Sequence, residues 1–292
     1  MTQSGSPHTL QNRPQLITYP DSLGGHLGAL GRLLNGPLAG YFSGVHILPP
    51  FPSSGDRGFA PVTYREIEPA FGTWDDIRKI GAGHDVLIDL MVNHISRRSP
   101  EFRDFMRRGR RSPYGDLFIT PDKIWPDGAP REEDVAKIFL RRPMPPFSAV
   151  RIEETGEIET VWTTFGRTEP TEHIDLDVHS AAVRALLLDH LRFFAANNIR
   201  IVRLDAVGYV IKKAGTSCFM VGPDIYEFID WLIAEADALG LTLLPEVHGE
   251  RSLQHRLAAR GYWVYDFVLP LLVLHTMISG SEDRSMCFLS ST

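Results

Sequence analysis

The sequence predicts an α/β fold, a (β/α)8 TIM barrel that is incomplete, with about six βα units and a small domain inserted after the third strand. Short apolar, β-branched runs alternate with helical patterns, which is typical of a parallel sheet covered by helices. Polar and charged residues follow several of these runs, at the strand ends where such sheets bind ligands. One long interval, residues 95–173, does not repeat the βα pattern, which indicates the insertion.

The expected strands are six short apolar runs. They cover residues 16–19, 44–48, 86–92, 199–204, 241–246 and 263–267. A barrel of this type closes only with eight strands, so six strands leave two open edges and an unfilled interior. We therefore expect a C-terminally truncated chain that aggregates through its exposed apolar strand edges.

The expected helices have apolar residues at spacings of three and four. They cover residues 23–34, 74–80, 179–197, 224–239 and 269–278. Thr73 suits the N-cap position of the second helix. Another short helix is expected inside the inserted interval, because Ser99 suits an N-cap, Pro100 a first turn and Gly109 a helix end.

The pattern divides the chain into segments. Residues 1–14 are expected to be disordered, and residues 281–292 form a polar tail. The partial barrel comprises residues 15–94 and 174–280, and the inserted domain comprises residues 95–173. The many arginines from Arg97 to Arg111 could form a phosphate-binding patch. A solvated helix face is the simpler interpretation.

Composition argues against several classes of protein. The 292 residues carry a formal net charge of −6, which does not favour nucleic acid or an anionic membrane as a partner. No run approaches the roughly 18 apolar residues of a membrane span, and the N-terminus lacks the apolar core of a signal peptide. Neither Cys218 nor Cys287 lies in a CxxC pattern. A reduced, cytoplasmic protein is therefore expected.

The most informative run is IRIVRLDAVGY, in which an apolar strand ends in Arg203 and Asp205. Residues two apart on a strand project from the same face. A guanidinium group favours the ionised form of a neighbouring carboxyl group, which suits a carboxylate nucleophile. A buried ion pair without a catalytic role is the alternative interpretation.

Three further segments end or follow expected strands. Glu246 ends the fifth strand with His248 two residues beyond, His94 follows the third strand, and Phe59 follows the second. Each has a structural alternative: a hydrogen-bonded carboxylate, a structural histidine or a core aromatic ring. Two carboxylates at the ends of successive strands are what glycosidic-bond chemistry requires. The joint occurrence of these segments favours a site at a barrel mouth.

Four motifs resemble the conserved regions of the α-amylase superfamily, glycoside hydrolase family 13. They are VNH after the third strand, RLDAVG on the fourth, EVH on the fifth and HIDLD at the end of the insertion. Within this superfamily, LITYPDSLG, GVHILPPFPSSGDRGFAP and RLDAVGY followed by KKAGTSCFM resemble the sucrose phosphorylase-like subfamily. The resemblance covers residues 15–274 and implies a TIM-barrel catalytic domain with an inserted B-type domain.

The resemblance implies a retaining glucosyl transfer from sucrose to phosphate, giving α-glucose 1-phosphate and fructose. Asp205 would be the nucleophile, Glu246 the acid/base, and Arg203 would hold Asp205 ionised. A covalent glucosyl-enzyme would form between carboxyl groups about 5–5.5 Å apart. The resemblance implies no cofactor and no metal, and the partners would be a small sugar and inorganic phosphate. The other implied substrate-binding residues are Asp56, Phe59, His94, Phe165, Tyr209 and His248.

Two departures from the family pattern leave acceptor and activity open. The third carboxylate of the superfamily belongs to an HD motif, and no HD dipeptide follows Glu246. The tract GRTEPTEHIDLD, with His173 where Gln is common, resembles relatives that act on sucrose 6-phosphate or glucosylglycerate. Alternatives are therefore a phosphorylase of either compound, a hydrolase of the superfamily, or an inactive truncated remnant. We expect little or no turnover from this chain.

Overall fold

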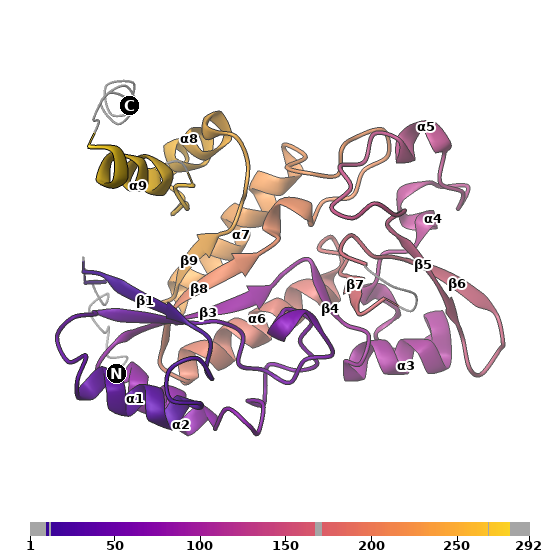
Figure 1. Cartoon of the computed structure of the whole chain (residues 1–292). Coiled ribbons are helices and arrows are strands. Elements are labelled where there is room, and N and C mark those ends of the chain that lie inside the picture. Colours follow the sequence, from indigo (N-terminus) through magenta and orange to yellow (C-terminus); the bar gives the residue numbers. More distant parts are fainter. Residues whose placement is uncertain (1–9, 12, 167–170, 268, 281–292) are drawn as a thin grey trace, which may run out of the picture. The chain divides into compact units, whose positions relative to one another are not determined.

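The main sheet has five strands in the order β1-β2-β3-β8-β9 (Figure 1). The computed structural model describes residues 10–11, 13–166, 171–267 and 269–280. The strands are β1 Gln15–Thr18, β2 Gly44–Ile47, β3 Asp85–Met91, β8 Ile199–Asp205 and β9 Thr242–Pro245. Pairing is parallel from β1 to β2, from β2 to β3 and from β3 to β8. This order confirms the predicted α/β barrel fold, which is incomplete because a closed barrel needs eight strands.

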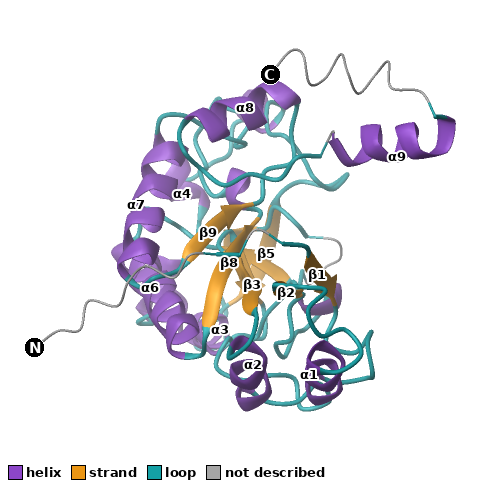
Figure 2. Ribbon diagram, turned by 90° about the vertical axis from the view of Figure 1, so that its left-hand side faces the viewer, coloured by secondary structure: helices purple, strands orange, loops and turns teal. Residues whose placement is uncertain are grey.

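Helices cover the outer side of these strands, as the alternating sequence pattern predicts (Figure 2). They are α1 Leu27–Asn35, α2 Trp74–Gly81, α6 Ala181–Ala196 and α7 Asp224–Ala238. In α6 the buried residues are Val183, Leu187, Leu191 and Phe194, at spacings of three and four. The helix α2 begins at the expected cap, where the backbone N–H of Thr73 donates to Asp76 Oδ2 at 2.9 Å. Apolar stripes on these helices therefore form the core against the sheet.

The interval between β3 and β8 contains short elements and two small antiparallel sheets, β4 with β7 and β5 with β6. The elements are β4 His94–Ser96, α3 Pro100–Arg108, α4 Pro121–Ile124, α5 Glu132–Val135, β5 Phe147–Arg151, β6 Ile158–Trp162 and β7 His173–Asp175. Ser99 caps α3 as expected. Trp125 and Trp162 stack with ring centroids 6.0 Å apart and anchor a separate apolar cluster. The domain boundaries themselves stay a prediction.

Three of the arginines of this interval are paired with carboxylates. Arg110 donates to both oxygens of Asp122 at 2.6 and 2.8 Å and to Glu159 Oε1 at 2.9 Å. Arg107 donates to Asp104 at 2.6 Å, and Arg111 lies 3.2 Å from Glu154. Because their charges are neutralised within the domain, the solvated-face interpretation is favoured over a phosphate patch.

The chain divides into two compact units, Met1–Leu243 and Leu244–Thr292. The second unit contains α8 Arg251–Ala259 and α9 Leu269–Ser279. The expected strand at residues 263–267 was wrong, because the chain there has no regular secondary structure and Trp263 is 57% exposed. An apolar run becomes a strand only where a neighbour takes up its N–H and C=O groups. The helix α8 was not foreseen, although Leu253 and Leu257 are four residues apart and buried.

Several expectations fall on residues outside the described part of the chain. They concern residues 1–9, residue 12, the tail at 281–292 and Cys287. Cys218, which is described, is a free and buried thiol. Among the described residues, the helices are too short or too polar to cross a membrane.

Burial of His190 in α6 predicts a loss of stability in acid. Its ring lies 4.6 Å from that of Tyr64, and no described residue bonds its Nδ1. Burial, followed by the charge of Arg65, lowers the pKa of His190 to about 4. The unfolded chain therefore takes up this proton first as the pH falls below about 6.5, which favours unfolding.

We expect the free energy of unfolding to fall by about 2 kcal/mol between neutral pH and pH ~5 because of His190. The loss should be complete near the pKa of His190 in the folded protein. Urea unfolding at the two pH values measures this change. The variant His190→Gln should lose correspondingly less on acidification, whereas a matched change at the exposed His255 should behave like the parent. Equal pH dependence in parent and His190→Gln would contradict the prediction.

Candidate active site

A chain of four polar side chains crosses three neighbouring strands at their carboxyl ends. Nη1 of Arg203 donates to Asp89 Oδ1 at 2.5 Å and to Asp205 Oδ1 at 2.8 Å. On the far side of Asp89, His46 Nε2 lies 2.8 Å from Oδ2. Sheet register explains the arrangement, because Asp89 on β3 is directly opposite Arg203 on β8. The two residues predicted from one strand are thus joined by two others from β2 and β3.

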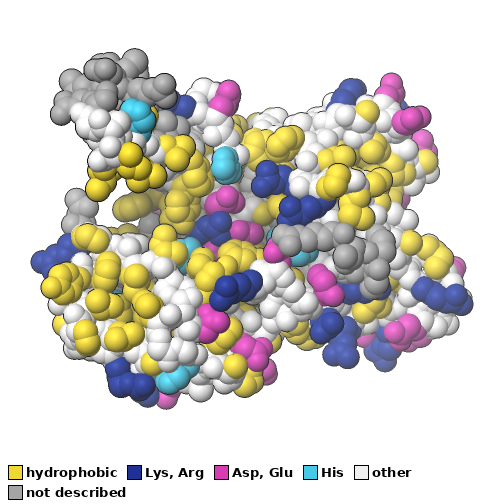
Figure 3. Space-filling view, viewed as in Figure 1, with side chains coloured by type: hydrophobic (Ala, Val, Ile, Leu, Met, Phe, Trp, Pro, Cys, Tyr) yellow, Lys and Arg dark blue, Asp and Glu magenta, His cyan; other side chains and the backbone are white. Residues whose placement is uncertain are grey.

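The two members of this chain on β8 are more exposed than the two on β2 and β3. The Asp89 side chain is fully buried, whereas those of Arg203 and Asp205 are each 15% exposed. The Asp89–Arg203 pair fits the structural interpretation of a buried ion pair. Asp205 ends the chain of side chains and keeps 15% of its side chain exposed, so a substrate could reach this carboxylate. Acidic and basic side chains lie side by side over the carboxyl end of β8 (Figure 3).

His94 and two aromatic residues form a wall near this carboxylate. The rings of His94 and Phe165 are 5.2 Å apart, and those of Phe165 and Tyr209 are 5.3 Å apart. Burial lowers the pKa of His94, against the opposing influence of Asp175. The ring is therefore neutral, and its Nε2 donates to the Phe59 carbonyl at 3.0 Å. A neutral, oriented imidazole beside aromatic rings suits the binding of an uncharged sugar ring.

The short turn η1, Asp56–Gly58, brings Asp56 to this wall. Asp56 Oδ2 lies 3.7 Å from His173 Nε2, and the His173 ring is 4.8 Å from that of His94. Asp56 and Arg57 have φ of 50° and 52°, and such a conformation costs of order 1–3 kcal/mol each. At Gly58, with φ of 105°, an added Cβ would lie 2.6 Å from the Pro49 carbonyl oxygen. The position of the Asp56 carboxylate therefore requires a strained backbone in this turn.

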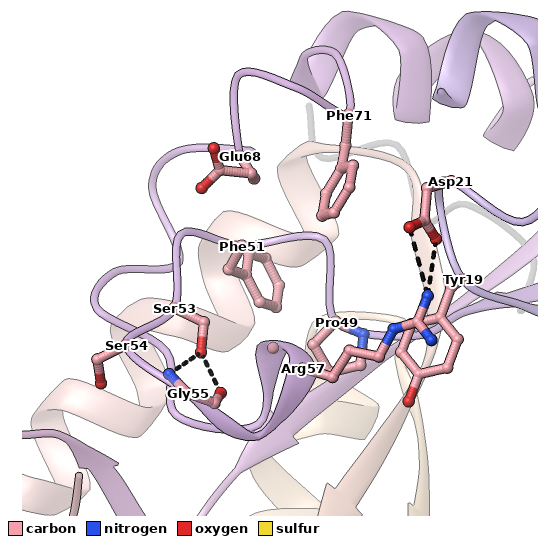
Figure 4. Close-up of a pocket in the computed structure, with 11 residues that line it drawn as sticks. Tyr19, Asp21, Pro49, Phe51, Ser53, Ser54, Gly55, Arg57, Glu68 and Phe71 are labelled. Atoms are coloured by element: carbon pink, nitrogen blue, oxygen red, sulfur yellow. Dashed lines mark hydrogen bonds and ion pairs between the residues drawn. The ribbon is translucent and has the colours of Figure 1, made fainter. Parts of the chain in front are cut away.

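The other side of this turn lines a pocket of about 290 Å³ (Figure 4). The guanidinium of Arg57 lies 4.1 Å over the Tyr19 ring and donates to Asp21 at 3.3 Å. Phe51, Glu68 and Phe71 complete much of the lining. Within this turn, Arg57 and Gly58 therefore line the pocket, whereas Asp56 contacts His173.

Tyr209 belongs to η4, Val207–Tyr209, and continues into an aromatic shelf. Its ring lies 6.4 Å from Phe139 in a stacked arrangement and 4.8 Å from Phe219. The guanidinium of Arg141 lies 5.9 Å over the Tyr209 ring. Phe139, although apolar, is 49% exposed, as expected of a side chain at the edge of a binding site. Neither Phe139 nor Arg141 was predicted as a site residue.

A buried lysine that follows β8 links a residue that follows β3 to the strand β7. Lys212 Nζ donates to Asn93 Oδ1 at 2.9 Å, pairs with Asp175 Oδ2 at 2.8 Å and contacts the Tyr209 carbonyl. Its side chain is only 1% exposed, and that of Asp175 is fully buried. Three oxygens from three segments thus surround one ammonium group. Among the described residues, no group of three or more His, Cys, Asp or Glu side chains could hold a metal ion.

The structure therefore brings seven of the nine predicted site residues together in the first unit. They are Asp56, Phe59, His94, Phe165, Arg203, Asp205 and Tyr209. Phe59 joins them through its ring, which lies 5.8 Å from the Arg203 guanidinium. Glu246 and His248 belong to the second unit, where Glu246 follows β9 directly and His248 stacks on Phe267 at 4.6 Å. The predicted separation of the two carboxyl groups stays a prediction.

Comparison with known proteins gives consistent matches. The family model described as "Alpha amylase, catalytic domain" matches residues 41–254. A sucrose 6(F)-phosphate phosphorylase of Thermoanaerobacterium thermosaccharolyticum is 57% identical over 282 residues, which are 97% of this chain and 58% of that protein. A sucrose phosphorylase of Streptococcus mutans serotype c is 39% identical over 273 residues, 94% of this chain and 56% of that protein.

A solved structure shows the same fold. The crystal structure of sucrose 6F-phosphate phosphorylase from Thermoanaerobacter thermosaccharolyticum superimposes with a TM-score of 0.94, covering 97% of this chain and 58% of that one, at 57% identity. The chain thus spans a little more than half the length of the relatives that it matches. Because the catalytic-domain model covers most of its residues, and the sheet and motifs agree with it, this chain belongs to the alpha-amylase family of glycoside hydrolase family 13.

Proposed function

We propose that this chain carries the glucosyl-transferring site of a phosphorylase-type enzyme. The observation that carries the proposal is the Arg203 guanidinium, which binds the buried Asp89 and the partly exposed Asp205 at once. A carboxylate held in this way is favoured in its ionised, nucleophilic form. The family membership and the named phosphorylase relatives support the same conclusion.

The proposed reaction is a retaining double displacement. In the first step, an Asp205 oxygen bonds to the anomeric carbon of an α-glucoside while the bond from that carbon to the leaving oxygen breaks. Glu246 gives its proton to the leaving oxygen. In the second step, a phosphate oxygen bonds to the anomeric carbon, the ester bond to Asp205 breaks, and Glu246 takes the phosphate proton. The products are the released alcohol and α-glucose 1-phosphate.

The aromatic wall of His94, Phe165 and Tyr209, with Asp56 at its edge, is proposed as the glucosyl subsite. Aromatic faces bind the apolar faces of sugar rings, and a few polar groups fix their orientation. The Asp56 carboxylate would supply a polar group, and the His94 ring, whose Nε2 is held by the Phe59 carbonyl, would line the subsite. His248 is proposed to border the acceptor subsite.

Among the donors expected from the sequence, we favour sucrose 6-phosphate over sucrose. One relative that carries this compound in its name is 57% identical and another is 32% identical, whereas three sucrose phosphorylases are 37–41% identical. Arg141 over the Tyr209 ring supplies a cation at the edge of the proposed glucosyl subsite. Guanidinium groups are well suited to phosphoryl groups.

Phosphorolysis assays test the proposal. The chain would be incubated with phosphate and sucrose 6-phosphate, sucrose or glucosylglycerate, and α-glucose 1-phosphate and free glucose would be measured. A hybrid enzyme, in which this chain replaces the matched residues of the Thermoanaerobacterium relative, would be assayed in parallel. We expect α-glucose 1-phosphate from the hybrid, fastest with sucrose 6-phosphate. Free glucose as the main product would indicate a hydrolase, and a hybrid without turnover would refute the proposed site.

A further inference from the structure

His46 is an ionisable residue near the carboxyl end of a buried strand. All four residues of β2 are buried, and the His46 side chain is 5% exposed. A buried polar group requires a hydrogen-bond partner, and the partner here is Asp89 Oδ2 at 2.8 Å. Because a carboxylate oxygen only accepts, His46 Nε2 carries the proton and donates it.

Asp89 is held from both sides. One oxygen accepts from His46 on β2, and the other accepts from Arg203 on β8. The Asp89 side chain is fully buried, so water cannot replace a missing donor. Removing His46 would leave Oδ2 without its donor and would free the carboxylate to rotate. Arg203 shares its Nη1 between Asp89 and Asp205, so a rotation of Asp89 would move the guanidinium relative to Asp205.

We propose that His46 is a positioning residue of the glucosyl-transfer site, acting through Asp89 and Arg203 on the nucleophile Asp205. The inference rests on the proposed function of Asp205. The other ionisable groups of this region are Asp89 on β3, Arg203 on β8 and Tyr64, whose hydroxyl accepts from the Met91 N–H. His46 does not contact Asp205 directly, so its effect is on orientation and ionisation rather than on bond making.

Two variants separate hydrogen bonding from packing. His46→Leu removes the donor and keeps a comparable apolar volume, whereas His46→Gln places an amide N–H near the position of Nε2. His84→Gln, at the amino end of β3, is the matched control. Thermal unfolding of each 292-residue variant is compared first, so that a loss of fold is recognised.

The first measurement needs no substrate. Amidation of Asp205 by a water-soluble carbodiimide and an amine is followed across the acidic pH range by peptide mass spectrometry, with the exposed Asp237 as an internal reference. For His46→Leu, we expect the pH at which amidation of Asp205 is half of its maximum to rise by about one unit. A neighbouring Arg lowers the pKa of an Asp by about 1–3 units, and the variant should lose part of that effect. His46→Gln and His84→Gln should remain close to the parent.

The second measurement is single-turnover glucosylation of Asp205 by α-glucosyl fluoride. We expect it to slow about tenfold in His46→Leu and to recover in His46→Gln, because small displacements of catalytic groups have effects of this size. If folded His46→Leu keeps the parent protection profile, or if His46→Gln behaves like His46→Leu, the positioning role is wrong. If His46→Leu shows the protection shift but the parent is not glucosylated at Asp205, the nucleophile assignment would instead be refuted.

Discussion

Replacing Asp205 by Asn is expected to abolish covalent glucosylation and to lower phosphorolysis by the hybrid enzyme on the order of 10⁴-fold or more. An amide has nearly the same shape as the carboxylate, and its oxygen can still accept the hydrogen bond from Arg203. It cannot form the glucosyl ester, because it lacks the negatively charged oxygen that attacks the anomeric carbon. The substitution therefore tests nucleophilicity with little change in packing.

Intact-mass spectrometry after incubation with α-glucosyl fluoride measures this prediction. The parent should gain the mass of one glucosyl group on the peptide that contains Asp205, and Asp205→Asn should gain none. Asp237→Asn, on the exposed side of α7, is the matched control and should label like the parent. Labelling of Asp205→Asn, or a parent label on another peptide, would show that a different residue is the nucleophile.

Replacing Lys212 by Met is expected to lower the free energy of unfolding by about 3–5 kcal/mol, the usual cost of removing one partner from a buried ion pair. The fully buried Asp175 would lose its counter-charge, and Asn93 would lose its donor. Met fills much of the same volume, so the loss would come mainly from the uncompensated charge and not from a cavity.

Urea unfolding of matched variants measures the effect. Lys213→Met is the control, because Lys213 is adjacent in sequence, 56% exposed and 3.6 Å from Asp224. Lys213→Met should lower the free energy of unfolding by less than about 1 kcal/mol, which is the usual contribution of an exposed ion pair. The double variant Lys212→Met with Asp175→Asn should recover part of the loss, since the orphaned charge is removed. Equal losses in Lys212→Met and Lys213→Met would contradict the prediction.

Much of the barrel could be predicted because its inner strands are largely buried on both faces. Residues 86–92 and 199–204 form apolar, β-branched runs. When such runs alternate with amphipathic helices, few folds other than a parallel sheet covered by helices can bury them. The antiparallel strands β5 and β6 were missed, because short hairpins in a segment rich in Pro and charge have little periodicity. The run at 263–267 has strand-like composition, but composition does not supply the neighbour that a strand needs.

The residues of the candidate site also divide into those that the sequence predicts and those that it does not. Arg203 and Asp205 were found because they are two residues apart, so a single strand determines their common face. Asp89 and Lys212 were missed as partners, because each bonds residues more than 100 positions away. The only local signal was an ionisable group inside an apolar run, which is also visible at His46 in GVHILPP. A charged residue in a fully apolar strand therefore indicates a partner on the neighbouring strand.

Lys212 also determines how the junction between β7 and the segments that follow β3 and β8 responds to its surroundings. A free cation held by the same three oxygens would be in exchange with the medium, so the junction would weaken whenever that ion became scarce or was chelated. An ammonium group on the polypeptide has no dissociation equilibrium of this kind. Its occupancy is fixed when the chain is synthesised, and the junction is assembled whenever the protein is folded.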